Sequence, residues 1–277
     1  MIRKIMIVMF SLMLTVSMVW LGEIARQENV SSGDNEEAAR IAMVQTCDLA
    51  VDLPGIENTQ ERELQPNMPD QIVGYTDPEI EELLLMDIEA LRDVNNDVIG
   101  WIRIPDTNID YPLLYGEDNE HYLKHSWKNE SSDVGAIFME HENSENLMDF
   151  NTIIYGHNMR SGSMFGSLKE YRSRDFWEKH PCIYILHEEG VFRYDIFAAY
   201  RVGLGNITYA MQINDPEQRA EFIRYALENS QLDTGIQPDA GDRIITLSTC
   251  TDDPDYRWVV QGVLNDEQSY YKKIVAD

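Results

Sequence analysis

The residues best suited to chemistry lie near the C-terminal end of the chain, where Cys250 closes a β-branched, apolar run that begins at Ile244. A second such run starts seven residues later, with Arg257. The two runs are typical of neighbouring strands joined by a short acidic loop. A thiolate is a nucleophile and a fixed guanidinium stabilises an oxyanion, so the pair predicts acyl transfer. The alternative is a buried structural thiol beside a surface arginine, because free cysteines are commonly buried.

A cysteine nucleophile needs a base or an ion-pair partner, and His157 is the best placed of the six histidines. It follows an apolar run (residues 152–155) and a glycine, and it precedes a polar stretch that contains a further glycine. Strand ends that open into such loops often present functional groups. A plain surface histidine is the alternative. The sequence leaves open whether His157 and Cys250 rest as an ion pair or as neutral groups.

The other histidines do not define a metal site. His121 and His125 are four residues apart, which is a ligand spacing on a helix, but H-E-x-x-H is absent and no third ligand has a clear position. His141 lies between two glutamates and has the same weakness. His180 and His187 are expected at the surface. Calcium loops of EF-hand spacing are also absent, so we expect no metal and no cofactor.

Composition limits the possible partners. The net charge of -27 argues against nucleic acid as a binding partner, because the chain has no basic surface that could displace the counterions of phosphates. A hydrophobic content of 43% is ample for a packed core. The three cysteines form no disulfide framework and no C-x-x-C zinc motif, and a bridge between Cys47 and Cys182 is left open.

Residues 1–25 are predicted to be an N-terminal membrane anchor. Arg3 and Lys4 precede an uncharged, apolar run over residues 5–21. As a helix this run would span about 26 Å, close to the roughly 30 Å of a hydrocarbon core. The basic end is expected in the cytoplasm, which predicts a single-pass protein of the cell membrane with its catalytic domain outside. A cleaved signal peptide is the alternative, although no good small-x-small cleavage site follows the run.

The rest of the chain divides into residues 26–75, an acidic extracytoplasmic spacer with a short helix from about 36 to 51, and a catalytic domain, residues 76–277. Asp77 and Pro78 predict a helix over 78–93, and Asp215 and Pro216 predict a second helix to about 229. The remaining pattern predicts a mostly antiparallel β-barrel. Its expected strands are 98–104, 109–114, 135–139, 152–155, 182–186, 191–202, 243–247, 257–264 and, less regularly, 269–275.

The cysteine strand ends in Thr246-Leu247-Ser248-Thr249-Cys250, which resembles the T-L-x-T-C signature of sortases, the cell-surface transpeptidases of Gram-positive bacteria. Residues 155–158 are similar to the histidine loop of that family, and residues 257–260 to its arginine strand, in the order that the family requires. The helices before the barrel and before the cysteine strand are most similar to class B. The resemblance covers roughly residues 78–277 and implies a closed sortase-type barrel of about eight strands with N-terminal helices and an inserted helix before the cysteine strand.

The resemblance also implies roles for individual residues. Cys250 would be the nucleophile, His157 the general acid and base, and Arg257 the group that stabilises the oxyanion and the substrate backbone. Residues 203–213 would form a wall of the substrate cleft. Further cleft residues are expected at Asn119, Leu123 and Ser248.

The function implied is that of a membrane-anchored cysteine transpeptidase. It would cleave a C-terminal sorting motif of surface proteins after a threonine, form a thioacyl-enzyme on Cys250, and transfer the protein to a peptidoglycan cross-bridge amine. The alternatives are a sortase that polymerises or anchors pilins and a catalytically inactive sortase-like binding domain. A papain-like protease is disfavoured, because its cysteine precedes its histidine whereas His157 precedes Cys250 here.

Overall fold

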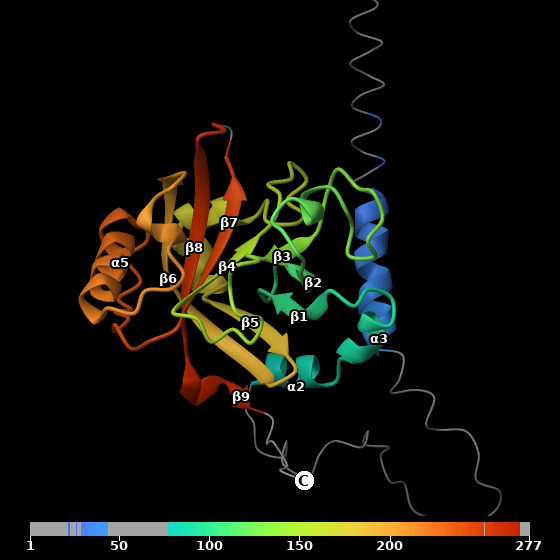
Figure 1. Ribbon diagram of the computed structural model, residues 1–277, viewed down its shortest axis with the longest axis horizontal. Helices are drawn as coiled ribbons and strands as arrows, with labels where there is room; N and C mark the ends of the chain where they lie inside the picture. Colours follow the sequence, from blue (N-terminus) through green and yellow to red (C-terminus); the bar gives the residue numbers. More distant parts are fainter. Residues whose placement is uncertain (1–21, 23–25, 27–28, 44–76, 252, 272–277) are drawn as a thin grey trace, which may run out of the picture.

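The computed structural model describes residues 22, 26, 29–43, 77–251 and 253–271, in which helices surround a strongly curved sheet (Figure 1). The strands are β1 (Val98–Arg103), β2 (Asp110–Tyr115), β3 (Ile137–Met139), β4 (Asn151–Tyr155), β5 (Cys182–His187), β6 (Gly190–Gly203), β7 (Ile244–Cys250), β8 (Tyr256–Leu264) and β9 (Tyr270–Tyr271). The helices include α2 (Pro78–Leu84), α3 (Ile88–Arg92), α4 (Arg174–Lys179) and α5 (Pro216–Asn229). The 3-10 turns are η3 (His121–Leu123), η4 (Leu168–Arg172), η5 (Ile207–Tyr209) and η6 (Asp266–Gln268).

The strands are arranged in the order β5-β1-β2-β3-β4-β7-β8-β6-β9, and an additional pairing of β5 with β6 closes the sheet into a barrel. Strands β2 and β3 are parallel, as are β4 and β7, and the other pairs are antiparallel. The predicted closed, mostly antiparallel barrel is confirmed.

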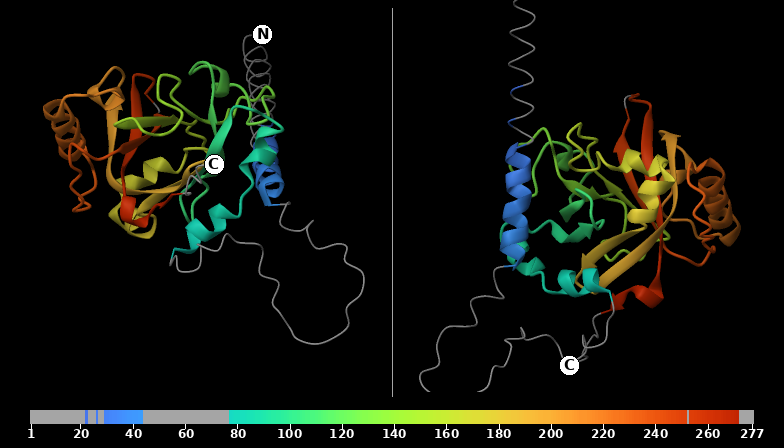
Figure 2. Two further views of the ribbon diagram at one scale, coloured as in Figure 1. Left: turned by 60° about the horizontal axis from the view of Figure 1, so that its bottom comes forward. Right: turned by 180° about the vertical axis from the view of Figure 1, so that it is seen from behind.

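Three apolar clusters hold the fold together. The barrel interior contains fully buried side chains such as Ile102, Ile245 and Val260. A second cluster lies between the barrel and the N-terminal helices, and a third lies beneath α5. Each large aliphatic side chain buried in this way contributes about 1.5–3 kcal/mol. Figures 1 and 2 show α5 and the helix formed by residues 29–43 on opposite sides of the barrel.

The prediction of one helix over residues 78–93 is wrong, because this stretch forms α2 and α3 with a break between them. The first helix starts as predicted, with the Asp77 side chain accepting a hydrogen bond from the amide of Glu79. The break occurs because Asp87 caps a new helix through a bond from the amide of Ala90. Aspartate bonds to nearby backbone amides more readily than it continues a helix.

Part of the predicted spacer is folded onto the barrel. Residues 29–43 are helical, and Ala38 and Ala42 are buried in the second apolar cluster. This segment is therefore not a solvated spacer. Residues 44–75 and nearly all of the predicted anchor, residues 1–25, lie outside the part of the chain that the structure describes. Within the described part, none of the helices has the length and apolar character needed to cross a membrane.

The inserted helix α5 follows the prediction: Asp215 caps it by accepting a bond from the amide of Glu217. Two histidines differ from the prediction of surface positions. His180 is buried and its Nδ1 donates to the Pro105 carbonyl at 2.9 Å, and His187 is buried at the end of β5. Burial lowers the pKa of His187. The Cys182 thiol is also buried, and its candidate partner Cys47 lies outside the described residues.

Candidate active site

Three neighbouring strands, β4, β7 and β8, bring the predicted catalytic positions together. In the parallel pair β4–β7, Tyr155 lies opposite Ser248, and in the antiparallel pair β7–β8, Cys250 lies opposite Arg257. Two residues beyond the Tyr155–Ser248 pair, one chain reaches His157 and the other reaches Cys250. The topology therefore places the histidine, the cysteine and the arginine at the same end of three adjacent strands.

A buried chain of hydrogen bonds fixes the alignment of these strands. Thr246 of β7 donates to the side-chain oxygen of Asn151 on β4 at 2.6 Å and accepts from the amide nitrogen of Gln261 on β8 at 2.9 Å. The Asn151 side chain also donates to the Thr208 carbonyl in η5, at 3.1 Å. The three side chains are 0% exposed. Buried polar groups are costly to leave unpaired, so a shift of register is strongly disfavoured.

The imidazole of His157 is oriented by the β2–β3 loop, residues 116–136. Its Nε2 lies 2.8 Å from the carbonyl oxygen of Leu123. A carbonyl only accepts hydrogen bonds, so Nε2 carries a proton and Nδ1 is the nitrogen left for proton transfer. The His157 carbonyl in turn accepts from the amide of Phe165 at 2.9 Å, which closes the histidine loop, residues 156–166.

The guanidinium of Arg257 is held by the loop that precedes it. Its Nη1 donates to the carbonyls of Pro254 and Tyr256 at 2.8 and 2.9 Å. That loop is tied to β6 by Arg201, which pairs with Asp253 at 2.9 Å and stacks over the ring of Tyr256. The loop therefore orients the guanidinium of Arg257, whose backbone pairs with Cys250 at the end of β7.

The segment predicted to form a cleft wall, residues 203–213, lies against the cysteine strand. Tyr209 in η5 shares a hydrogen bond of 3.0 Å with the hydroxyl of Ser248, which is almost fully buried. Ser248 therefore belongs to the junction between β7 and this segment.

Asn119 is linked to Tyr155 by the buried carboxylate of Glu140. Its side-chain nitrogen donates to one oxygen of Glu140, and the Tyr155 hydroxyl donates to the other at 2.8 Å. Burial alone would raise the pKa of Glu140, but these hydrogen bonds outweigh it and keep the pKa below its usual value. Burial and the charge of Glu140 raise the pKa of Tyr155. Glu140 is therefore ionised at neutral pH and Tyr155 is a donor.

The three predicted cleft residues therefore contact the site in different ways. The backbone carbonyl of Leu123 accepts from His157, and the hydroxyl of Ser248 bonds to Tyr209. Asn119 is linked to Tyr155 through Glu140. The sequence did not indicate a role for three further residues: Tyr155, which precedes the histidine by two positions, Glu140, which accepts from Tyr155 and Asn119, and Tyr209, which bonds to Ser248 of the cysteine strand. Tyr155 lies in the motif that marks the histidine loop, so its position carried a signal. The other two come from loops whose approach depends on tertiary packing.

The barrel and the arrangement of its three strand ends are those of a cysteine acyltransferase. Residues 102–265 match the sortase domain family. The sortase B of Listeria monocytogenes is 38% identical over 183 residues, which cover 64% of this chain and 74% of that protein. The sortase B of Staphylococcus aureus is 31% identical over 164 residues, or 59% of this chain and 67% of that protein.

Solved structures agree with these relatives. A Staphylococcus aureus sortase B–substrate complex superposes with a TM-score of 0.62 at 30% identity, covering 64% of this chain and 84% of that one. The Clostridium perfringens sortase B superposes with a TM-score of 0.61 at 30% identity, covering 65% of this chain and 100% of that one. The chain belongs to the sortase family, in class B. It is a cysteine transpeptidase of the sortase B type.

Proposed function

We propose that this transpeptidase is membrane-anchored and joins surface proteins to the cell wall. It cleaves a C-terminal sorting motif after a threonine, holds the protein as a thioacyl-enzyme on Cys250, and transfers it to an amine of the peptidoglycan cross-bridge. The observation that supports these roles most directly is the alignment of β4, β7 and β8, which brings His157, Cys250 and Arg257 to one end of the sheet.

In the first step the Cys250 thiol gives its proton to Nδ1 of His157, and the resulting thiolate attacks the threonine carbonyl carbon. The carbon–sulfur bond forms while the carbonyl oxygen becomes negatively charged, and the Arg257 guanidinium stabilises that charge. The carbon–nitrogen bond then breaks, and Nδ1 of His157 gives its proton to the leaving amine. The Leu123 carbonyl holds the Nε2–H throughout, so the ring does not turn during the transfer.

In the second step the acceptor amine attacks the thioester carbon. His157 takes the proton from the amine at Nδ1, the carbon–sulfur bond breaks, and the Cys250 thiolate is regenerated. Transfer to an amine rather than to water requires a thioester shielded from bulk solvent. Residues 203–213 favour this, because the Tyr209–Ser248 hydrogen bond keeps them over the cysteine strand.

The test is a peptide-library assay on the folded chain from residue 26 onward, with an amine acceptor present. We expect cleavage after threonine, ligation to the amine, and a thioacyl adduct on Cys250 detected by mass spectrometry. Cys250→Ala and His157→Ala should abolish both reactions. Cleavage and ligation by Cys250→Ala would disprove the assignment.

Thiol labelling supplies a matched control. An alkylating probe should label Cys250 selectively, whereas the buried Cys182, whose pKa is raised by burial, should stay unlabelled until the chain unfolds. Cys182→Ala should therefore label and react as the unchanged chain does. Selective labelling without cleavage of any library peptide would instead favour an inactive, sortase-like binding domain.

Membrane anchoring is supported by the apolar run over residues 5–21 and the two basic residues before it. The full chain should sediment with membranes and be cleaved by protease added outside intact protoplasts. Removal of residues 1–25 should release it. A full chain that remains soluble would rule out the anchor.

A further inference from the structure

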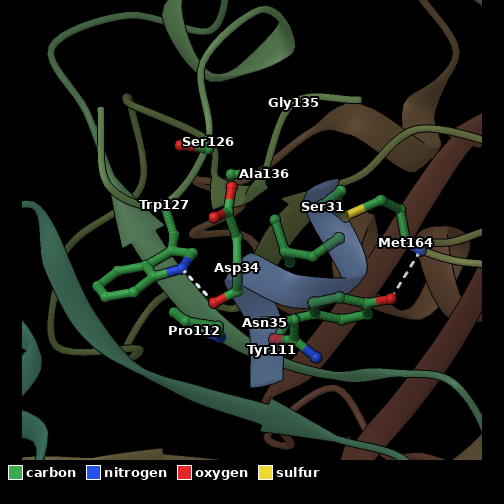
Figure 3. Close-up of a pocket in the computed structure, with 11 residues that line it drawn as sticks. Ser31, Asp34, Asn35, Tyr111, Pro112, Ser126, Trp127, Gly135, Ala136 and Met164 are labelled. Atoms are coloured by element: carbon green, nitrogen blue, oxygen red, sulfur yellow. Dashed lines mark hydrogen bonds between the residues drawn. The ribbon is translucent and has the colours of Figure 1, made fainter. Parts of the chain in front are cut away.

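The helix formed by residues 29–43, hereafter the N-terminal helix, lies on one side of the barrel (Figure 2). Side chains of the β2–β3 loop bind it through directional contacts. The Lys128 ammonium lies 2.8 Å from the carboxylates of both Asp34 and Glu37. The indole nitrogen of Trp127 donates to the backbone carbonyl of Asp34 at 2.8 Å (Figure 3). Lys128 and Asp34 are largely buried side chains, so this ion pair is screened less than a surface pair.

The loop that receives the helix is the one that orients His157. Trp127 is linked back along the loop by Asn95, whose side-chain nitrogen donates to the Trp127 carbonyl at 2.7 Å and to the Tyr122 hydroxyl at 2.9 Å. Tyr122 directly precedes Leu123, the residue whose carbonyl accepts from Nε2 of His157. A short series of buried contacts therefore runs from the helix to the imidazole.

A second series of contacts reaches the backbone of the histidine loop. The Asn35 side chain of the N-terminal helix donates to the carbonyl of Asp110 at 2.8 Å, at the start of β2. The next residue, Tyr111, accepts a hydrogen bond from the amide of Met164 at 3.0 Å (Figure 3). Met164 belongs to the loop that closes on the His157 carbonyl. The helix thus supports both the Leu123 carbonyl, which accepts from the His157 ring, and the loop that binds the His157 backbone.

The contact between the helix and the barrel is not continuous packing. A small cavity remains between them, lined by Asn35, Tyr111, Trp127 and Met164 among others (Figure 3). The docking therefore combines the apolar packing of Ala38 and Ala42 with directional contacts beside this cavity, and single side chains among those contacts can be changed without opening the barrel core.

We propose that the N-terminal helix positions the catalytic histidine, and that Asp34, Trp127 and Lys128 are positioning residues of this transpeptidase. The inference rests on the role proposed above for His157. When the helix is loosened, the Leu123 carbonyl moves away from Nε2, and the imidazole rotates and exchanges tautomers. Displacements of about 1 Å in a catalytic group commonly lower rates by up to roughly 100-fold.

The first test removes one hydrogen bond and keeps the aromatic ring. In Trp127→Phe we expect kcat to fall by roughly 5- to 20-fold with KM within about twofold, because substrate-binding groups are untouched. The matched control is Trp177→Phe, which deletes another indole-to-carbonyl hydrogen bond, to Ile196 at 3.0 Å, from α4. The control should leave kcat and KM unchanged.

The second test concerns the charge. Lys128→Met should lower kcat to a similar extent, and Lys128→Arg should restore most of it, because arginine can still pair with both carboxylates. In both Trp127→Phe and Lys128→Met, ¹⁵N NMR of His157 should change from a single Nε2–H tautomer to an exchanging mixture. Trp177→Phe and Lys128→Arg should keep the single tautomer.

The inference fails if Trp127→Phe and Lys128→Met lower only the melting temperature while kcat and the His157 tautomer stay unchanged, since the helix would then be a structural brace alone. This result differs from a failure of the proposed function, which would appear as the absence of a Cys250 thioacyl adduct in the unchanged chain. The NMR measurement tests the positioning in either case.

Discussion

The two sides of the active site are built in different ways. On the nucleophile side, β7 and β8 pair continuously from Ile244–Val263 to Cys250–Arg257, so the backbone ladder itself places the last pair. On the histidine side, His157 lies beyond the end of β4 and takes its ring orientation from Leu123, which is 34 residues away in the sequence. The positions of Cys250 and Arg257 are therefore set by local strand pairing, whereas the orientation of His157 is set by a loop that is distant in the sequence.

This difference predicts which substitutions change catalysis alone and which change catalysis together with the stability of the fold. A side chain at the end of a regular ladder can be removed without disturbing the ladder, whereas a loop that orients a ring through a single carbonyl transmits small backbone shifts to the chemistry. Substitutions on the nucleophile side should change catalysis alone. Substitutions around His157 should change catalysis and stability together.

Among substitutions that leave Cys250 and His157 in place, the largest effect is expected for Arg257→Ala. Loss of an oxyanion-stabilising group commonly costs about 100- to 1,000-fold in rate, so kcat/KM should fall by that order. The melting temperature should hardly change, because the guanidinium donates to the carbonyls of Pro254 and Tyr256 in its own loop. Arg257→Lys should restore only part of the rate, since an ammonium lacks the planar, forked donors. Steady-state kinetics and thermal unfolding of the three proteins decide this. Activity of Arg257→Ala close to that of the unchanged chain would place the oxyanion stabilisation elsewhere.

On the histidine side, Gly135→Ala should lower both activity and stability. Gly135 has a φ of +66°, and a Cβ there would lie 2.5 Å from the Tyr122 carbonyl and 3.0 Å from Cδ2 of His157. We expect a loss of about 1–3 kcal/mol in the free energy of unfolding, from strain, and a fall in kcat of roughly 10-fold. Gly241→Ala is the control, because a Cβ there meets nothing within 4 Å. If Gly135→Ala lost stability but kept its kcat, the loop would not control the histidine.

The same difference between local and distant contacts explains which features of the structure the sequence predicts correctly. The caps at Asp77 and Asp215 use local backbone amides, and the apolar runs that end at Cys250 and start at Arg257 form the paired strands that their pattern predicts. The order of the strand-borne groups was therefore predictable. Each of these features depends on residues close together in the sequence or on one regular ladder.

What the sequence could not indicate depends on partners far along the chain. The sequence predicts an acidic spacer over residues 29–43, because Lys128, the cation that binds the carboxylates of this segment, is about ninety residues away. His187 reads as a surface residue although β5 buries it. Glu140 gives no local sign that Asn119 and Tyr155 will converge on it. Periodicity carries no information about such tertiary contacts.

A smaller effect is expected for Glu140→Gln. The hydrogen bonds to Glu140 keep its folded-state pKa below the ordinary value of 4.5, so the carboxylate stabilises the fold above that pH and the contribution is lost as pH falls through the folded-state pKa. At pH 7 the variant should be less stable by about 1–2 kcal/mol, a typical value for hydrogen bonds to a charged group. The gap between the two proteins should narrow as the pH falls below 4.5. Chemical unfolding over a series of pH values from 7 downward measures it, and a gap independent of pH would show that the charge of Glu140 contributes nothing.

The smallest effect is expected for Tyr209→Phe, which tests whether the nucleophile side also depends on a loop. The variant loses the hydrogen bond of 3.0 Å to Ser248 and keeps the ring. Such a bond contributes about 0.5–1.5 kcal/mol, so we expect KM to rise by roughly 2- to 10-fold as residues 203–213 loosen, with kcat nearly unchanged. Ser248→Ala and the double variant complete a cycle that should give a coupling of about 1 kcal/mol in kcat/KM. If Tyr209→Phe instead lowered kcat as strongly as Gly135→Ala does, the cysteine strand would need its loop as much as the histidine needs Leu123, and the two sides of the site would not differ in kind.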